Sequence, residues 1–264
     1  MSSLLHGVDV HARYQSGFNI KNVPNVDFVI TKCSGGASFT IPNWSTMLTD
    51  AELTGVYHYA REKGYAGTAK EEAENFISQA QNAPEDANLF LDWEESTNTN
   101  LGDSDWILTW LQTVEAALGR KPLLYTYEAV LKAHANLSTI RDAGYQLWYA
   151  RYPYSTAVGW QNYDQPTASN WGKPIMWQYS SAGMVDGWQK ALDLNIFYGS
   201  KEDWLALSGS QMHVETESYD KLYVASGEKV YQANLLFGTY QEVSSNIEAT
   251  LSIEDETTLG VKIQ

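Results

Sequence analysis

The stretch "NLFLDWEES", residues 88–96, ends an apolar run with three carboxylates. If the apolar run is a β-strand, residues two apart share a face, so Asp92 and Glu94 point together and Trp93 points to the opposite face. Two carboxylates on one partly desolvated face repel each other, and one of them then keeps its proton near neutral pH. Such a pair supplies a general acid and a base from similar side chains. The alternative is a strand that ends in solvent, with both carboxylates hydrated.

Eight apolar, strand-like runs recur through the first 200 residues, separated by helical or glycine-rich stretches. This alternation is typical of parallel strands joined by crossovers, and it predicts an α/β protein with an irregular TIM-like (β/α) barrel. Helices are predicted at 68–83, where Thr68 can cap the first turn, and at 103–119, where Gly119 ends the pattern. Residues 151–174 are predicted to form a long loop. The strands are expected at 6–11, 28–34, 55–61, 88–94, 122–128, 146–151, 174–180 and 191–197.

In a (β/α) barrel, functional residues collect where the strands end. The first and last expected strands carry Asp9 and Asp193, and these two strands adjoin when a barrel closes. Other strand ends carry aromatic residues, although a single aromatic residue in a strand more often belongs to the core. Aromatic rings beside carboxylates favour a carbohydrate cleft, because the C–H faces of a sugar pack on rings while its hydroxyls need polar partners. The candidate sugar contacts are Tyr57, Tyr59, Tyr125, Tyr127, Trp148, Trp177 and Tyr179.

The composition argues against several other classes of function. The chain has 264 residues and a net charge of −15, which disfavours nucleic acid and anionic membrane surfaces as partners. No apolar segment reaches the ~20 residues that a membrane helix needs. The single cysteine, Cys33, allows neither an intrachain disulfide nor a cysteine metal site, and we expect no metal and no cofactor. The N-terminal segment lacks the features of a signal peptide, so synthesis in the cytoplasm is expected.

The composition changes near the end of the chain. Residues 213–264 contain no tryptophan and no proline, and they alternate apolar and polar residues as β-strands do. We therefore expect a catalytic barrel at 1–208 and a small β-rich module at 209–264. A role in cell-wall targeting or assembly is expected for this module, because it lacks a constellation of residues suited to catalysis. The alternative is a passive, stabilising appendage.

Eight ordered segments resemble the family 25 glycoside hydrolases, the lysozymes that cut peptidoglycan and that include many phage endolysins. They are "HGVDVHARYQ", "FVITKCSGG", "GVYHYAR", "LFLDWEE", "PLLYTYE", "LWYARY", "MWQYSSAGMVDG" and "LDLNIF". The resemblance covers about residues 5–207. It implies an irregular α/β barrel and an N-acetylmuramidase that hydrolyses the β-1,4 bond between N-acetylmuramic acid and N-acetylglucosamine. The family's four acids fall on Asp9, Asp92, Glu94 and Asp193.

The resemblance and the chemistry together imply a role for each acid. Glu94 is the expected general acid, and Asp92 would hold its proton by proximity and stabilise charge. Asp9 and Asp193 would hold the sugar or tune the pair. Retention and inversion of stereochemistry both stay open, because the separation of the carboxyls decides between them. A phage endolysin of this type would be made in the host cytoplasm and act on the wall after release.

Two segments depart from the family pattern. His11 stands where the family usually has a serine, and "ARYQ" adds one residue before Gln15. Gly35-Gly36 stands where the family often has Glu-Gly. The contacts to the sugar near the first two strands are therefore not implied by the resemblance.

Two other classes of function stay open at this point. His11 on the first strand and His58 on the third would suit a metal-dependent amidohydrolase, since histidines at strand ends are typical ligands. Against this, His58 alternates with two tyrosines, which favours a hydrogen-bonded structural residue. A barrel that binds wall glycan without cleaving it is the other possibility, and the intact set of four acids argues against it.

Overall fold

The computed structural model describes residues 4–94 and 98–209, and the strands of a C-terminal segment. The chain divides into two compact units, residues 1–212 and residues 213–264. Each unit is described by itself. Among the described residues no helix has the length and apolarity needed to span a membrane.

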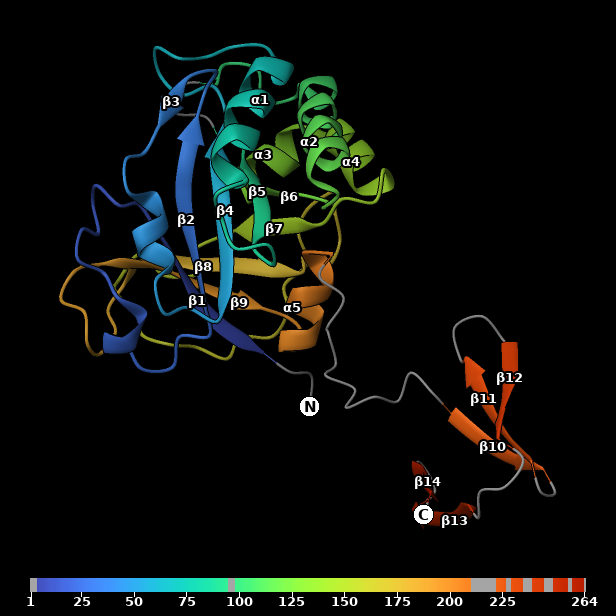
Figure 1. Ribbon diagram of the computed structural model, residues 1–264. Helices are drawn as coiled ribbons and strands as arrows, with labels where there is room; N and C mark the ends of the chain where they lie inside the picture. The colour runs from blue at the N-terminus through green and yellow to red at the C-terminus, as the bar shows by residue number, and fades with distance from the viewer. Residues whose placement is uncertain are drawn as a thin grey trace. The chain divides into compact units, whose positions relative to one another are not determined.

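The first unit is an irregular α/β barrel, as predicted (Figure 1). Its strands follow one another around the barrel in the order β1-β9-β8-β7-β6-β5-β4-β2, and a β1–β2 pairing closes the ring. The short strand β3 (Phe39–Thr40) adds to the edge of β2. The barrel strands are β1 (Leu5–Val10), β2 (Phe28–Gly35), β4 (Leu53–Tyr59), β5 (Asn88–Asp92), β6 (Leu123–Tyr127), β7 (Leu147–Ala150), β8 (Met176–Gly183) and β9 (Leu192–Phe197).

The expectation that all eight strands run parallel is wrong for the last one. Strand β9 pairs antiparallel with both of its neighbours, β8 and β1, while the other barrel pairs are parallel. The physical reason lies in the connection at 184–191, which contains no helix. A parallel neighbour needs a crossover of a dozen or more residues, whereas an antiparallel one can follow a short loop.

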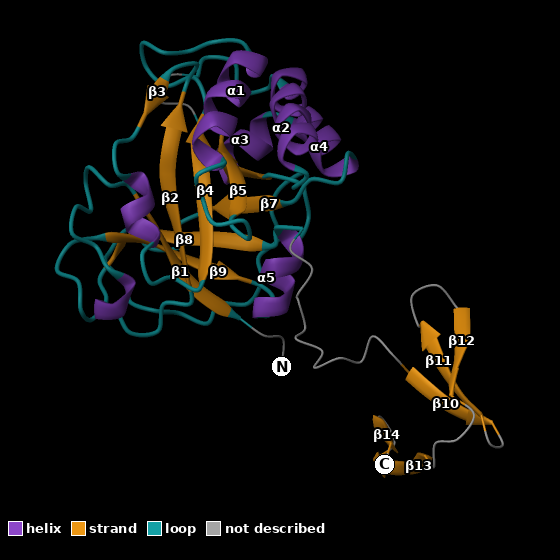
Figure 2. Cartoon of the chain, viewed as in Figure 1, coloured by secondary structure: helices purple, strands orange, loops and turns teal. Residues whose placement is uncertain are grey.

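Most helices lie against one side of the barrel (Figure 2). Helix α1 (Ala69–Ala80) begins with a capping box between Thr68 and Glu71. Helix α2 (Ser104–Leu118) is capped by Asp103 and ends at Gly119, whose φ of 67° suits glycine. Both predicted helices are thus confirmed. Shorter helices follow at α3 (Glu128–Ala133), α4 (Ser138–Asp142) and α5 (Lys201–Leu207), with 3-10 turns at Ile20–Asn22, Trp44–Leu48 and Ala135–Leu137.

The barrel wall separates two apolar clusters. Strand residues that point inward, such as Phe28, Phe90 and Trp148, fill the barrel interior together with Trp204 of α5. Residues of opposite parity, such as Leu91 and Trp93, pack in the outer cluster with α1 and α2. This alternation fixes which strand residues reach the open end of the barrel. The predicted long loop is confirmed at 151–174, where the structure has only an isolated bridge.

The second unit contains five described strands. Strands β10 (Leu222–Ser226), β11 (Lys229–Asn234) and β12 (Thr239–Ser244) form an antiparallel sheet. Strands β13 (Ala249–Asp255) and β14 (Thr258–Ile263) form a hairpin. These five strands lie within the segment for which the sequence predicts a β-rich module.

Candidate active site

The four candidate acids gather around Tyr57 at one end of the barrel. Strands β1, β5 and β9 bring Asp9, Asp92 and Asp193 there, and Glu94 follows two residues after β5 ends. The pKa of Tyr57 is raised well above its usual value, first by burial and then by the negative charges of Asp92, Asp9, Asp193 and Glu94. All four carboxylates are therefore close enough to Tyr57 to shift the pKa of its phenol, and we treat them as a single cluster.

Two buried amide side chains hold Asp9 in place. Its Oδ2 accepts hydrogen bonds of 2.8 Å from Gln178 Nε2 and from Asn195 Nδ2. Gln178 Oε1 in turn accepts hydrogen bonds from the hydroxyls of Tyr125 and Tyr152, at 2.8 and 2.7 Å. Asp9 is thus a fixed acceptor at the floor of the site, because each of its amide partners is itself positioned by neighbours.

Asp9 and Asp193 lie directly opposite each other in the antiparallel pair of β1 and β9. Burial raises the pKa of Asp9 to about 6, although the amide hydrogen bonds oppose the shift. Burial, the charges of Asp9 and Glu94, and a hydrogen bond to Asp9 raise the pKa of Asp193 to about 8. At neutral pH the two carboxyls therefore share a proton, which Asp193 donates to Asp9.

This pair makes stability depend on pH. An unfolded aspartate loses its proton near pH 3.8, so between about pH 4 and pH 8 the folded chain binds more protons than the unfolded chain. The free energy of unfolding should therefore be greatest below pH 4, as far as this pair is concerned, and fall as pH rises to 8. We expect Asp193→Asn to flatten this slope and to stabilise the protein at pH 8 by about 1 kcal/mol or more. Urea unfolding of both proteins from pH 5 to 8 measures the free energy of unfolding at each pH. The same dependence on pH in both proteins would contradict this prediction.

The second pair, Asp92 and Glu94, differs in one respect from the sequence expectation. Strand β5 ends at Asp92, so Glu94 does not belong to a regular strand. The buried Trp93 nevertheless points outward, and its Nε1 donates to the Leu101 carbonyl. Burial raises the pKa of Asp92 well above its usual value, and the charge of Glu94 raises it further. The Asp92 Oδ1 is buried and has no hydrogen-bond partner among the residues that the structure describes.

A pocket of about 450 Å³ opens beside Glu94. Its walls follow strands β6 and β7, and they include Tyr127, Arg151 and Tyr152. Tyr152 is 45% exposed, so its ring is available to a ligand while its hydroxyl stays bonded to Gln178. The pocket combines flat apolar rings with charged groups, a lining that suits a sugar.

The structure brings most, but not all, of the candidate aromatic residues to this end of the barrel. Tyr57, Tyr59, Tyr125 and Tyr127 lie on inward-facing positions of β4 and β6. Trp148 also points inward but is 2% exposed, and its Nε1 donates to Asn195 Oδ1, so it supports the floor beneath the acids.

Trp177 and Tyr179 lie on the other side of the barrel wall, contrary to the prediction. Both pack in the outer cluster and bond to backbone carbonyls of the long loop, Arg151 and Gly159. The cause is the parity of β8, in which Met176 and Gln178 point inward. Gln178 was therefore missed, although an amide between two aromatic residues on a strand was a usable signal. Tyr152, two residues beyond the end of β7 at Ala150, was the other residue missed.

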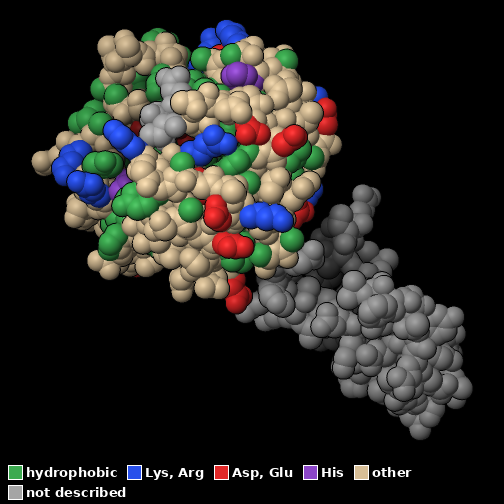
Figure 3. All heavy atoms as spheres, turned by 90° about the horizontal axis from the view of Figure 1, so that it is seen from above, with side chains coloured by type: hydrophobic (Ala, Val, Ile, Leu, Met, Phe, Trp, Pro, Cys, Tyr) green, Lys and Arg blue, Asp and Glu red, His purple; other side chains and the backbone are tan. Residues whose placement is uncertain are grey.

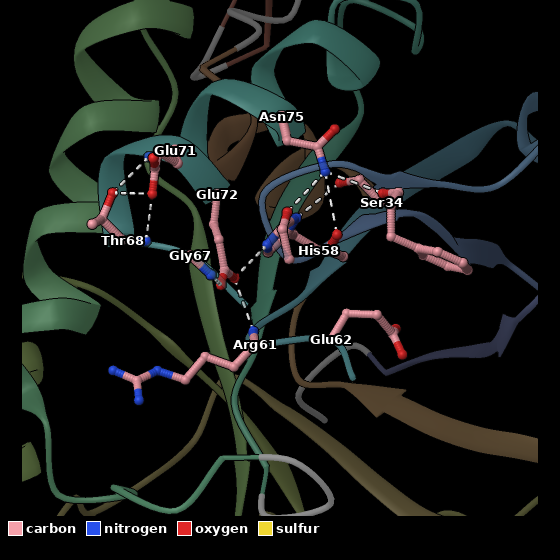
Figure 4. Close-up of polar contacts among 12 residues, drawn as sticks. Ser34, His58, Arg61, Glu62, Gly67, Thr68, Glu71, Glu72 and Asn75 are labelled. Atoms are coloured by element: carbon pink, nitrogen blue, oxygen red, sulfur yellow. Dashed lines mark hydrogen bonds and ion pairs between the residues drawn. The ribbon is translucent and has the colours of Figure 1, made fainter. Parts of the chain in front are cut away.

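A buried polar chain lies behind the site, on the outer face of β2 and β4 (Figure 4). Ser34 Oγ and His58 Nδ1 are 2.9 Å apart, and His58 Nε2 is 3.1 Å from Glu72 Oε2. Burial lowers the pKa of His58, so the imidazole is neutral and donates through Nε2. Glu72 also accepts the backbone N–H groups of Arg61 and Gly67, both at 2.8 Å.

This chain of Ser, His and Glu has the order of a hydrolytic triad but not its accessibility. All three residues are fully buried, so Ser34 cannot reach a substrate. The prediction that His58 is a hydrogen-bonded structural residue is confirmed. Among the described residues no cluster of three side chains that could hold a metal ion occurs. The polar chain instead fixes the loop after β4, where Arg61 adopts a left-handed φ of 54°.

Glu72 offers a test of that structural role. Glu72→Ala would leave the buried N–H groups of Arg61, Gly67 and His58 without their acceptor, at a cost of about 2–5 kcal/mol. Glu72→Gln keeps the size and one acceptor oxygen, so it should cost about half as much. Chemical denaturation of both variants measures the difference. Equal stability of Glu72→Ala and the parent protein would rule out the structural role.

The departure at Gly35 has a structural explanation. A Cβ at this position would lie 3.0 Å from both the Cβ and the Oε2 of Glu62. The Glu62 carboxylate thus fills the space that a side chain at position 35 would need, and it pairs with Lys32 Nζ at 2.5 Å.

Comparison with known proteins identifies a matching family and solved structures with a similar fold. The family model described as glycosyl hydrolases family 25 matches residues 8–188, a range that includes Asp9, Asp92 and Glu94 and ends before Asp193. The uncharacterized protein YegX of Escherichia coli O157:H7 is 27% identical over 214 residues, covering 76% of this chain and 72% of YegX. A lysozyme structure from Streptomyces coelicolor has a TM-score of 0.64 and 24% identity, covering 80% of this chain and 100% of that one. A muramidase structure from Acremonium alcalophilum has a TM-score of 0.61 and 22% identity, covering 78% and 100%.

Proposed function

This chain belongs to glycosyl hydrolase family 25, and from that premise we propose that it is a lysozyme acting on bacterial peptidoglycan. The bond proposed to be cleaved is the β-1,4 bond between N-acetylmuramic acid and N-acetylglucosamine. The observation that carries the proposal is the gathering of four acids around Tyr57 at the end of the barrel. Two solved structures with a similar fold are those of a lysozyme and a muramidase, which supports peptidoglycan as the substrate class.

In the proposed reaction the Asp92–Glu94 pair holds one proton when the substrate binds, and the raised pKa of Asp92 favours that state. Glu94 lines the open pocket, so we assign it the delivery of that proton to the glycosidic oxygen. Asp92, which is buried, would then carry the negative charge that stabilises the oxocarbenium-like transition state. A water molecule supplies the hydroxyl that ends on the anomeric carbon and returns a proton to the pair of carboxyls. Asp9 and Asp193 would orient the sugar with their shared proton.

The assay that tests this proposal is the release of new reducing ends from purified peptidoglycan, in the presence and absence of a strong chelator. We expect release in both conditions, because the proposed reaction uses only carboxyl groups. Loss of activity with the chelator, restored by a divalent metal, would favour an amidohydrolase instead. Binding to peptidoglycan without any release of reducing ends would favour a barrel that only binds glycan.

For the C-terminal unit we propose cell-wall targeting or assembly, as an endolysin made in a host cytoplasm and acting on the wall after release would require. Deleting residues 210–264 should then leave hydrolysis of soluble glycan within about twofold and reduce the lysis of whole cells by about tenfold or more. Turbidity loss of cells and reducing-end release from soluble glycan measure the two activities in parallel. A folded, truncated protein that no longer cleaves soluble glycan would assign the unit to the active site.

A further inference from the structure

A second pocket, of about 530 Å³, is lined by residues of other strand ends. Its walls come from the segments after β1, β2 and β4, whereas the pocket beside Glu94 is lined after β5, β6 and β7. The charges of Glu94 and of the Lys32–Glu62 pair both shift the pKa of Asp92, so Asp92 lies within electrostatic reach of residues that line each pocket. We call this pocket the basic pocket.

Cations outnumber anions in the basic pocket, although the whole chain carries a net charge of −15. Arg13, Lys32 and Lys63 line it, and Glu62 is the one acid in its lining. Glu62 is already paired with Lys32. Arg13 and Lys63 are exposed and form no ion pair with the described residues. Figure 3 shows Lys and Arg side chains gathered with a histidine at one end of the face in view.

His11 adds no charge to the pocket. Burial and the charge of Lys32 lower its pKa to about 4, so the imidazole is neutral at physiological pH. Its Nδ1 accepts the backbone N–H of Arg13 at 3.1 Å, which fixes the turn that carries Arg13. The uncompensated charge of the pocket therefore belongs to Arg13 and Lys63.

Helix α1 holds the opposite wall in place (Figure 4). Asn75 Nδ2 donates to the carbonyls of Gly35, Gly36 and Phe39, at 2.8–3.2 Å, and so fixes the turn before β3. Glu72 fixes the loop that carries Lys63 through the amides of Arg61 and Gly67. The pocket is thus built on fixed backbone and needs little ordering when a ligand binds.

We infer that the basic pocket binds the carboxylates of the peptide attached to the muramic acid residue, with Arg13 and Lys63 as the anion contacts. This inference rests on the proposed peptidoglycan substrate and adds a specificity determinant to it. The lactyl group carries the peptide away from the glycan chain, and the peptide supplies free carboxylates at a distance from the bond that is cleaved. Tyr14 and Tyr65, 63% and 43% exposed at the same pocket, offer rings for the adjoining apolar groups.

The test compares two soluble glycan fragments, one with free peptide carboxyls and one with the same carboxyls converted to methylamides. At low ionic strength the parent protein should show a higher kcat/KM on the carboxylate form, through a lower KM. The double variant Arg13→Gln/Lys63→Gln should reduce this preference about five- to tenfold, as expected for two exposed ion pairs. Lys121→Gln/Lys201→Gln removes the same charge at the opposite end of the barrel and should keep the preference.

Every other outcome of this comparison contradicts a specific statement. Equal kcat/KM of the parent protein on both fragments, or an unchanged preference in Arg13→Gln/Lys63→Gln, would overturn the peptide contact and leave the glycosidase proposal intact. An equal loss of preference in both double variants would assign the effect to bulk charge. Failure of the parent protein to cleave either fragment would overturn the proposed function itself.

Discussion

Glu94→Gln should lower the rate of peptidoglycan hydrolysis by at least ~100-fold, because a general acid contributes ~10²–10⁴-fold and glutamine has no proton to transfer. The substitution keeps the size of the side chain that lines the pocket. It also removes the charge that raises the pKa of Asp92, so folding should be unharmed or improved. Initial rates of reducing-end release, with thermal denaturation of the same samples, provide the measurement.

The matched control is Glu74→Gln, the same chemical change on the exposed side of α1. It should leave the rate within about twofold. A folded Glu94→Gln protein that binds peptidoglycan and hydrolyses it at the parent rate would contradict the assignment, and the carboxylates after β5 would then be hydrated groups at a strand end.

Asp92→Asn should also lower the rate, by about 100-fold, since it removes a charge positioned next to the reacting bond. The residual activity should have its optimum at lower pH. The sign follows from the repulsion within the pair. The charge of Glu94 raises the pKa of Asp92, and because the repulsion is mutual, the charge of Asp92 opposes the ionisation of Glu94. Without the charge of Asp92, Glu94 gives up its proton at a lower pH. The protonated form that catalysis needs is therefore lost at a lower pH than in the parent protein.

The control for this variant is Asp105→Asn, which removes a carboxylate from the exposed first turn of α2. Its rate and pH profile should match those of the parent protein. An Asp92→Asn protein with reduced rate but an unchanged or higher pH optimum would show that Asp92 does not act through the proton of Glu94.

The barrel and its strands could be predicted because each strand is a short apolar run with polar residues at its end. Asp9 and Asp193 were predictable as neighbours from barrel closure alone, and the structure pairs them directly. The antiparallel direction of β9 could not be predicted, since strand direction depends on how the chain returns after β8. A sequence pattern contains the length of that connection but not its path.

The errors in the aromatic set have a common physical origin. Period-two alternation says that Trp177 and Tyr179 share a face, but it does not say which face points inward. The inward direction of Gln178 becomes evident only from its hydrogen bond to Asp9, which is 169 residues away in the sequence. The basic pocket was missed for a related reason, because Arg13 and Lys63 meet only when the turns after β1 and β4 are folded next to each other.

Mass spectrometry of the fragments released from purified cell walls, after borohydride reduction, tests the central claim most directly. The account predicts that the reduced end of each new fragment is N-acetylmuramitol with its peptide still attached, and that Glu94→Gln releases no such fragments. Fragments that end in reduced N-acetylglucosamine, or glycan chains freed of peptide without new reducing ends, would contradict it.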